Sequence, residues 1–306
     1  MNVYRSTQEV SGKIKKAVVT TGSFDGVHIG HKIIIGRLKQ LANEISGESC
    51  LVTFYPHPRK VLYPDQKDLK LINSQEEKIE LLSKTGLDNL VILPFSVEFS
   101  KTSSHDFIRG ILLDQLNAST IIVGKNHHFG HNRSGDYSYL YDLSRELKFS
   151  VEDIPLKDIE NETVSSTKIR RALTEGNIMR ANAYLDHHYI ITGITKIAPT
   201  LNGITKEVVY QSIIEEEEKL IPPPGIYATN VRCNGKTLKS MTIIVDNDEN
   251  QRTVNTSLLY HKDDLQDKNS TLFFYKKIRG REIFYQGDID ASEVKDAMEE
   301  VDELLY

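Results

Sequence analysis

The sequence predicts an α/β fold in which a mostly parallel sheet is followed by a small antiparallel β-barrel domain with a C-terminal helix. Three observations favour this fold. Residues 17–154 alternate strand-like apolar runs with helix-like segments, a rhythm that produces parallel sheets with helices on both faces. Beyond residue 187, short strands separated by turn residues are typical of small barrels. The final segment, "ASEVKDAMEEVDELLY", has apolar residues at helical spacing.

The first half is expected to contain five strands and four helices. Strands are predicted at "KAVVTTG", "SCLVTFYP", "LDNLVILPF", "ASTIIVGKN" and "SVEDIPL". Helices are predicted at "HKIIIGRLKQLANEIS", "SQEEKIELLSKTG", "SSHDFIRGILLDQLN" and "SYLYDLSRELKF". Ser74, and Ser103 or Ser104, are candidate N-caps, and Gly86 closes the second helix. In such sheets, ligands bind at the carboxyl ends of the strands, where the strand order reverses.

The second half changes character. "SSTKIRRALTEGNIMRANAYL" predicts two helices separated by Gly176. The stretches that follow read as barrel strands: "EVVYQSII", "GIYATNVRC", "KSMTIIVD", "RTVNTSLLYH" and "TLFFYKKIRG". We place the two domains at residues 1–186 and 187–306. The acidic run at residues 215–218 reads as a solvated loop.

Composition limits the class of protein. The 306 residues are 39% hydrophobic and 26% charged, as in folded globular proteins, and suffice for two domains. No apolar run approaches the roughly 20 residues of a membrane-spanning helix, and no signal core precedes the first strand. Cys50 and Cys233 form no CxxC pair or metal-binding spacing, which fits a reducing, cytoplasmic location. The net charge of −5 argues against nucleic acid as the main partner.

The stretch "TTGSFDGVHIGH", residues 20–31, lies where the first long strand passes into a helix. Gly22 and Gly26 permit tight turns and a close approach of the backbone to a ligand. Amide groups at a helix start favour an anion such as a polyphosphate. His28 and His31 lie about one turn apart, where their imidazoles could donate hydrogen bonds to a phosphoryl group as charge develops. The pattern is neither GxxxxGK[ST] nor GxGxxG.

Two other interpretations of the histidine pair stay open. The histidines could be structural residues at an ordinary helix start, or they could be two ligands of a metal ion. Their spacing suits metal binding, but no acidic or cysteine partner stands nearby in the sequence. The position between strand and helix favours nucleotide chemistry.

Four motifs together resemble those of the nucleotidyltransferases with an HxGH motif, in particular the bacterial FAD synthetases (FMN adenylyltransferases). "GSFDGVHIGH" resembles the first motif of this family and "TFYPHP", residues 53–58, the second. "VGKNHHFGHNRSGD", residues 123–136, resembles the third, although His127 stands where an aromatic residue is usual. "VSSTKIR", residues 164–170, resembles the fourth. The resemblance implies a Rossmann-like nucleotidyltransferase domain.

The resemblance also assigns roles to single residues. It implies catalytic roles for His28, His31 and Arg170. The residues that it implies for ATP binding are Gly22, Ser23, Phe24, Asp25, Gly26, Gly30, Ser166 and Thr167. Those that it implies for FMN binding are Pro56, His57, Pro58, Asn126, Phe129 and Gly130. "SSTKIR" on its own also fits a capped helix, and the glycine-rich loop fits a structural loop.

The reaction implied by the resemblance is the transfer of AMP from MgATP to FMN, which gives FAD and pyrophosphate. The attacking phosphate oxygen is already anionic, so positioning and charge neutralisation supply most of the catalysis. Mg²⁺ would be held mainly by the phosphates, with one or two protein groups and water. No protein ligand for the metal is assigned, and ATP and FMN are the expected partners.

The second half resembles the riboflavin kinase domain that follows the transferase domain in most bacterial relatives. "PPPGIYATNV" and "LFFYKKIRGREIF" resemble two of its strands. The kinase loop, GxGRxLGFPTAN, has no full counterpart between Tyr189 and Pro222, where only "APTLN" is comparable. Asn255 stands where the kinase has its glutamate base, and an amide cannot accept a proton as a carboxylate does. We therefore expect a kinase-like barrel without kinase activity.

Three alternatives to a monofunctional FAD synthetase remain open at this stage. The protein could be a bifunctional riboflavin kinase/FAD synthetase with a divergent kinase site. It could be a non-catalytic regulator that binds a flavin or a nucleotide, although both histidines and the residues of "SSTKIR" are present. It could also transfer a nucleotidyl group to a different phosphate ester, because HxGH indicates the chemistry better than the acceptor.

Overall fold

The computed structural model describes residues 1–65, 69–124, 129–131, 134–154, 158–159, 162–198, 208–246, 251–261, 263–280, 284–285 and 288–305. The chain divides into two compact units. The first contains residues 1–69 and 78–164, and the second contains residues 70–77 and 165–306. The domain division at residue 186 stays a prediction, because a compact unit need not coincide with a segment that folds alone.

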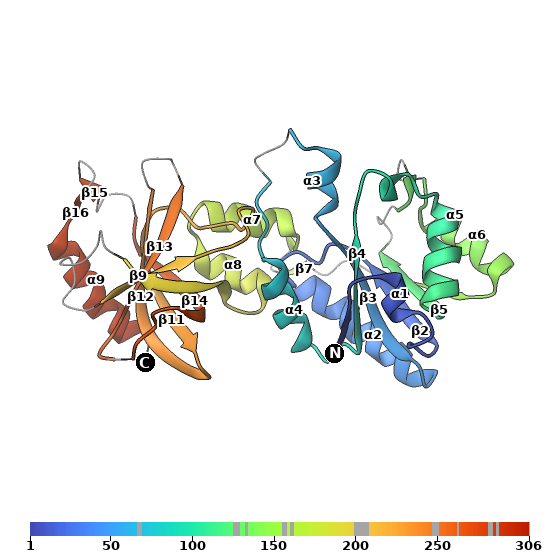
Figure 1. Ribbon diagram of the computed structural model, residues 1–306, viewed down its shortest axis with the longest axis horizontal. Helices are drawn as coiled ribbons and strands as arrows, with labels where there is room; N and C mark the ends of the chain where they lie inside the picture. The colour runs from blue at the N-terminus through green and yellow to red at the C-terminus, as the bar shows by residue number, and fades with distance from the viewer. Residues whose placement is uncertain are drawn as a thin grey trace. The chain divides into compact units, whose positions relative to one another are not determined.

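The first unit contains a six-stranded parallel sheet (Figure 1). Its strands are β1 (Asn2–Tyr4), β2 (Ala17–Thr21), β3 (Glu48–Tyr55), β4 (Asn89–Pro94), β5 (Ala118–Gly124) and β6 (Ser150–Ile154). The order across the sheet is β1-β4-β3-β2-β5-β6. The central strands are continuous apolar runs rather than alternating ones, as expected for strands covered on both faces. The order reverses at β2, which has β3 on one side and β5 on the other.

Helices cover both faces of this sheet. The helices between β1 and β6 are α1 (Thr7–Val10), α2 (Ile29–Glu44), α3 (Pro58–Leu62), α4 (Gln75–Ser83), η1 (Phe99–Lys101), α5 (Ser104–Asp106), the π-helix η2 (Phe107–Gln115) and α6 (Tyr137–Leu147). Of these, α3 and η1 bury none of their residues. Side chains of α1, η2 and α6 share one core cluster with strand residues such as Val19 and Val52. The buried residues of α2, among them Leu38, lie outside that cluster. The right-handed crossover from β2 to β3 places α2 on the opposite face.

The predicted N-caps are confirmed. The Ser74 hydroxyl accepts a hydrogen bond from the Glu77 amide at 3.2 Å, and the Glu77 carboxylate accepts one from the Ser74 amide at 3.0 Å. This reciprocal pair is a capping box at the start of α4. Ser103 caps α5, because its hydroxyl accepts a hydrogen bond from the Asp106 amide at 3.0 Å. Local sequence therefore fixes where these two helices begin.

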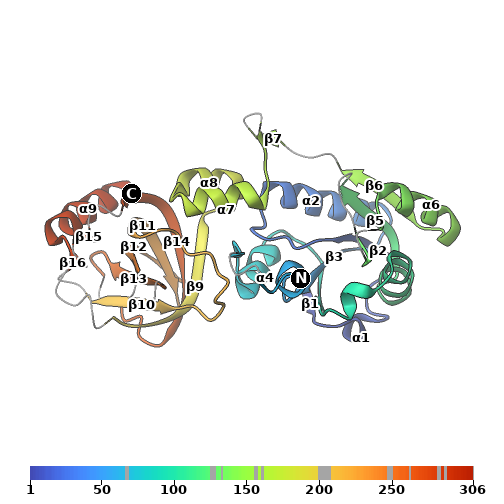
Figure 2. The same cartoon turned by 90° about the horizontal axis from the view of Figure 1, so that it is seen from above.

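The second unit contains a closed barrel of six antiparallel strands in the order β10-β13-β12-β11-β14-β9 (Figure 2). The strands are β9 (Tyr189–Ile197), β10 (Val209–Ile213), β11 (Gly225–Cys233), β12 (Lys236–Asp246), β13 (Arg252–Leu258) and β14 (Lys268–Arg279). Helix α9 (Ala291–Leu304) packs on the outer face against Ile226, Ala228 and Met241. Closure removes the exposed strand edges that an open sheet would present.

The remaining elements of the chain are short. Helices α7 (Ser166–Thr174) and α8 (Ile178–Leu185) flank Gly176, which has the positive φ of +77° that favours glycine. Two small ribbons pair β7 (Asp158–Ile159) with β8 (Glu162–Thr163) and β15 (Phe284–Tyr285) with β16 (Asp288–Ile289). The predicted α/β fold, with a parallel sheet followed by an antiparallel barrel and a terminal helix, is thus confirmed.

The sequence prediction omits strands β1 and β9, the short helices α1, α3 and η1, and the strands of the two small ribbons. β1 has only three residues and takes its place by pairing in parallel with β4, from Asn2 opposite Asn89. β9 contains Gly193, where a Cβ atom would lie 2.4 Å from the carbonyl oxygen of Ile213 on the neighbouring strand. A glycine inside a strand weakens the local signal, while here it permits the close approach of two strands.

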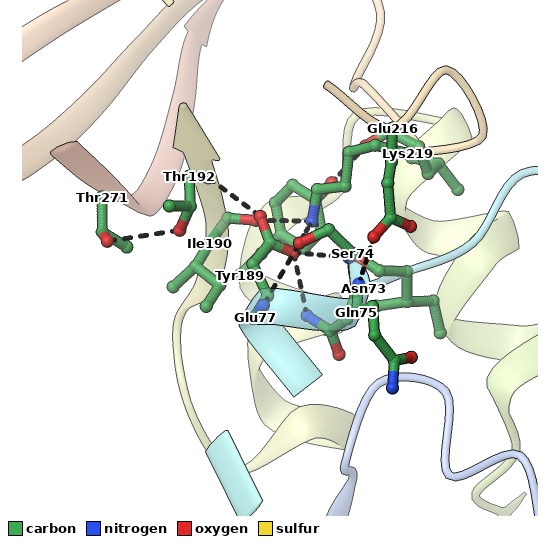
Figure 3. Close-up of polar contacts among 12 residues, drawn as sticks. Asn73, Ser74, Gln75, Glu77, Tyr189, Ile190, Thr192, Glu216, Lys219 and Thr271 are labelled. Atoms are coloured by element: carbon green, nitrogen blue, oxygen red, sulfur yellow. Dashed lines mark hydrogen bonds and ion pairs between the residues drawn. The ribbon is translucent and has the colours of Figure 1, made fainter. Parts of the chain in front are cut away.

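A buried ion pair joins residues 70–77 to the barrel within the second unit (Figure 3). Lys219 Nζ donates to Glu77 Oε2 at 2.5 Å and to the carbonyl oxygens of Ile72 and Ile190 at 2.6 and 2.7 Å. The side chains of Lys219 and Glu77 are only 1% and 0% exposed. Each buried charge therefore has a counter-ion and further hydrogen bonds, as burial of charge requires.

The same carboxylate organises the neighbouring backbone. Glu77 Oε1 accepts a hydrogen bond from the Thr192 amide of β9 at 2.8 Å. The acidic run before Lys219 is also less solvated than predicted, because the Glu216 carboxylate accepts a hydrogen bond from the Gln75 amide at 2.6 Å. The acidic run is therefore a loop that is also hydrogen-bonded to the start of α4.

We expect Glu77→Gln to lower the free energy of unfolding of the protein by about 3 kcal/mol, because it removes the carboxylate that pairs with the buried Lys219 ammonium group. Urea denaturation followed by circular dichroism measures the change. Asp302→Asn is the matched control, since Asp302 pairs with Lys239 at 2.9 Å but both side chains are about one-third exposed. Equal losses in the two variants would contradict a special role for the buried pair.

Candidate active site

Three of the four predicted motifs follow adjacent strands of the parallel sheet. The first motif follows β2, the second follows β3 and the third follows β5. Because the carboxyl ends of parallel strands meet at one edge of a sheet, the topology brings these motifs to the same edge. β2 is also the strand at which the order reverses. The first motif therefore lies where the sequence analysis expects a ligand, at the carboxyl end of the strand where the order reverses, and the site itself stays a prediction.

The loop after β2 turns sharply into α2. Phe24, Gly26 and Val27 have positive φ angles of +48°, +93° and +41°. The Val27 amide donates to the Phe24 carbonyl oxygen at 3.2 Å and closes the turn. Only glycine adopts this region freely, so the two other residues store roughly 1–3 kcal/mol of strain each. Such strain persists where the surrounding structure holds the loop in one conformation.

The loop brings the two histidines together. His28 is the N-cap residue of α2, and His31 lies in the first turn. Their rings stack with centroids 3.6 Å apart and planes 19° apart. The Phe24 ring stacks on His31 at 4.4 Å and 26°. Because each face of a ring holds one stacked neighbour, His31 lies between Phe24 and His28, and we call this group the three-ring stack.

Burial lowers the pKa of His31 well below the usual value of 6.5, and the neighbouring His28 and Lys78 lower it further. His31 as a whole is partly exposed to solvent, but its imidazole ring is stacked against Phe24 and His28. At neutral pH the His31 imidazole is therefore uncharged, with one N–H donor and one acceptor nitrogen. A neutral N–H donor can stabilise growing negative charge on a phosphoryl oxygen through a hydrogen bond.

Two other residues of the first motif are enclosed. Asp25 is 1% exposed, and Ser23 is half-buried, with its carbonyl oxygen accepting a hydrogen bond from the Thr53 hydroxyl at 3.3 Å. This bond ties the loop after β2 to β3. The loop is therefore fixed from the sheet side as well as from α2.

The second motif forms the exit from β3. Pro56 is exposed, and Pro58 is the first residue of α3. Proline suits this position because its missing N–H would have no helical partner. His57 is the N-cap, and its Nδ1 atom accepts a hydrogen bond from the Arg59 amide at 3.2 Å. In this structure His57 thus stabilises a helix start.

The described part of the third motif packs against α5. Phe129 and Gly135 exchange two backbone hydrogen bonds of 3.0 Å, and the Ser104 hydroxyl donates to the Phe129 carbonyl oxygen at 3.2 Å. Gly130 has a φ of +73°, and a Cβ atom there would lie 2.1 Å from the Ser104 hydroxyl oxygen. Asn126, predicted to contact FMN, lies outside the described residues.

The fourth motif begins α7 and belongs to the second unit. Ser165 is the N-cap, and its hydroxyl accepts a hydrogen bond from the Lys168 amide at 3.4 Å. Ser166 and Thr167 occupy the first two helical positions, and Arg170 follows about one turn later. The motif therefore offers hydroxyls, helix amides and a guanidinium group at one helix start.

The described ranges contain no group of three or more histidine, cysteine, aspartate or glutamate side chains placed to hold a metal ion. No helix in the described part of the chain is long and apolar enough to cross a membrane. The described cysteines, Cys50 and Cys233, are both buried and free.

Comparison with known proteins agrees with this geometry. The family model for FAD synthetase matches residues 11–168, which contain the first three motifs and most of the fourth. The chain belongs to the FAD synthetase family. A second family model, for riboflavin kinase, matches residues 200–300 in the barrel half.

Several curated relatives match most of the chain. A bifunctional riboflavin kinase/FMN adenylyltransferase of Listeria monocytogenes is 33% identical over 74% of this chain and 71% of its own length. A protein of the same name from Buchnera aphidicola is 28% identical over 93% of this chain and 92% of its own. A second Listeria protein, named FAD synthetase, is 30% identical over 75% of this chain and 87% of its own.

A solved structure shares the fold along nearly the whole chain. It is titled as a macrolide-efflux protein from Streptococcus pneumoniae, and it covers 99% of this chain and 97% of its own with a TM-score of 0.85. The two sequences are 19% identical, so the likeness concerns the fold alone.

The riboflavin kinase match requires a correction. We expected a barrel without kinase activity, and this doubt is not supported, because the kinase domain is detected over 101 residues, 200–300. The described part of that domain shows Asn255 to be 3% exposed, with its amide donating to the Thr253 hydroxyl at 3.1 Å. Residues 199–207, which include most of "APTLN", lie outside the described residues.

The sequence analysis missed two contributors to the site. The stacking of Phe24 on His31 depends on a chain reversal with two left-handed non-glycine residues, which no local pattern indicates. Lys78 influences His31 from α4, more than 40 residues along the chain, yet it reads as a surface residue of an amphipathic helix. Its 5% exposure shows that it is buried.

The lowered pKa of His31 predicts that acid destabilises the protein through this residue. Between pH 6.5 and the folded-state pKa, the unfolded chain binds a proton that the folded protein excludes, so stability falls as pH falls. The loss is at most about 1.4 kcal/mol for each pH unit. We expect His31→Asn to lose less stability than the wild type between pH 7.5 and 5.5 in urea titrations. Identical pH dependences would show that His31 titrates normally.

Proposed function

We propose that this protein transfers AMP from MgATP to FMN and releases pyrophosphate, which forms FAD. The observation that carries the proposal is the stacked histidine pair at the carboxyl end of β2, where the strand order reverses, inside the segment that matches FAD synthetase. The relatives that match most of the chain are named for the same chemistry.

The reaction proceeds by in-line displacement at the α-phosphorus of ATP. A phosphate oxygen of FMN forms the new bond to this phosphorus, and the bond to the oxygen that bridges the α- and β-phosphates breaks. Pyrophosphate leaves with that electron pair. Because the nucleophile is anionic and no proton must be removed from it, the site needs position and charge neutralisation more than a strong base.

Each named residue has a part in this proposal. His28 and His31 donate hydrogen bonds to phosphoryl oxygens as charge develops. Arg170 neutralises charge on the departing pyrophosphate, since guanidinium pairs well with phosphate. The ATP phosphates would be bound by backbone and side chains of residues 22–26, by Gly30, and by Ser166 and Thr167. Mg²⁺ would enter with ATP and be held mainly by its phosphates.

The acceptor site is proposed at the exits of β3 and β5. Pro56, His57 and Pro58 would form a rigid wall beside the flavin, since prolines restrict the backbone. Asn126, Phe129 and Gly130 would complete the FMN site. We assign this transferase activity to a domain of residues 1–186, because the fourth motif is then included.

Riboflavin phosphorylation is a second candidate function, favoured by the riboflavin kinase match over residues 200–300. Asn255 does not supply the carboxylate that the resemblance to riboflavin kinase implies at this position. A kinase reaction in this barrel would therefore need another group to accept the hydroxyl proton.

The test is one assay in two tubes, in which purified protein receives MgATP with either FMN or riboflavin. Chromatography of the products is expected to show FAD and pyrophosphate in the FMN tube. FMN or FAD in the riboflavin tube would establish the second function. No product in either tube would contradict both activities and favour a binding protein.

We expect His28→Ala and His31→Ala to raise the activation free energy for FAD formation by about 2 to 4 kcal/mol, because each removes a transition-state donor. Steady-state rates with saturating MgATP and FMN measure the change. Melting curves check that each variant is folded. Normal turnover in both folded variants would remove the histidines from the mechanism.

A further inference from the structure

We propose that Phe24 is a positioning residue, which holds His31, and through it His28, in the orientation that the transfer reaction uses. This inference rests on the proposed function. It differs from the role suggested by sequence resemblance, in which Phe24 contacts ATP. In this proposal, the Phe24 ring acts by stacking on the His31 imidazole, at one end of the three-ring stack.

The first support is the geometry of the stack. Phe24 is 3% exposed, and its ring is 4.4 Å from that of His31, which in turn is 3.6 Å from that of His28. Stacking on both faces of His31 restricts rotation of its imidazole. The direction of its N–H bond is thereby set before a nucleotide binds. Pre-set donors stabilise a transition state without a cost for reorientation during the reaction.

The second support comes from two glycines at the ends of the stack. A Cβ atom on Gly22 would lie 3.1 Å from two carbon atoms of the Phe24 ring. A Cβ atom on Gly30 would lie 3.2 Å from two atoms of the His28 ring. Neither glycine has a left-handed φ, so backbone conformation does not require glycine at these positions. The rings favour glycine instead, because a Cβ atom at either position would push the neighbouring ring by a few tenths of an ångström.

The third support is the backbone of the loop. Phe24 itself has a φ of +48°, in a region that phenylalanine rarely adopts. This conformation accompanies the turn that ends in the hydrogen bond from the Val27 amide to the Phe24 carbonyl oxygen. A strained conformation at a residue whose ring stacks on a proposed catalytic imidazole favours a functional role for that ring.

Phe24→Leu tests the proposal, because leucine keeps an apolar side chain but removes the ring. We expect kcat for FAD formation to fall on the order of tenfold, while KM for ATP and for FMN stay within twofold, since donor orientation is lost and ground-state binding is kept. Phe149→Leu is the matched control. Phe149 is 8% exposed in the core cluster of the same unit, so its loss should lower stability without changing kcat.

Imidazole proton resonances of the ligand-free protein give a second measurement that does not depend on activity. The Hε1 signal of His31 should lose the part of its ring-current shift that comes from Phe24 in Phe24→Leu and keep the full shift in Phe149→Leu. If Phe24→Leu fails to fold, Gly22→Ala replaces it, because its Cβ atom pushes the Phe24 ring while leaving it present. Gly22→Ala should then lower kcat and move the same signal.

The results separate this inference from the proposed function. A kcat within twofold of wild type would overturn the positioning role, as would a raised KM for ATP with unchanged kcat, which would indicate direct contact with the nucleotide. An unmoved His31 signal would also overturn it. If the wild-type protein makes no FAD, the proposed function fails, and the resonances alone then decide whether Phe24 holds His31.

Discussion

The reversal of strand order at β2 is the constraint on which the candidate site depends. In a parallel sheet every strand ends at the same edge, but only at a reversal do the connections to the two neighbouring strands leave on opposite faces. The chain from β2 turns at this point into α2, so the helix start, the loop and the histidine pair occur together. The neighbouring strands β3 and β5 add their own exit loops at the same edge.

The environments of two titratable side chains, His31 and Lys219, differ in whether the protein itself satisfies their hydrogen bonds. His31 is enclosed by other rings and is kept uncharged, which preserves a donor for phosphate chemistry. Lys219 is almost fully buried and is paired with Glu77 and two backbone carbonyl groups. The first arrangement leaves hydrogen-bonding capacity for a ligand, whereas the second satisfies its donor within the protein. This difference in hydrogen bonding is the one expected between the proposed binding site and a structural connection.

The parts of the fold that depend on local chemistry could be predicted from the sequence. The Ser74–Glu77 capping box, the Ser103 cap and the apolar runs of β2 and β5 each have a signal within a few residues. The pairing of His28 with His31 also follows from helical spacing. These features need no knowledge of distant parts of the chain.

Other features arise from contacts that the sequence does not display. Lys219 follows four glutamates and reads as a solvated residue, yet its partner Glu77 lies 142 residues away. Gly193 weakens the strand pattern of β9 in the sequence. The reason for the glycine is the close approach of Ile213 on the neighbouring strand, which is visible only in the folded chain. The burial of Lys78 and the stacking of Phe24 likewise depend on the folded chain.

The central claim is that the stacked histidines meet the phosphates of ATP. It is tested most directly by titrating the protein with Mg²⁺ and α,β-methylene-ATP, which cannot be cleaved at the α-phosphorus, while following the imidazole resonances. We expect the His28 and His31 signals to shift together and to saturate, whereas the signal of His105, a partly exposed residue of α5, stays constant. Saturable binding of the nucleotide that leaves both His28 and His31 unshifted would contradict the claim.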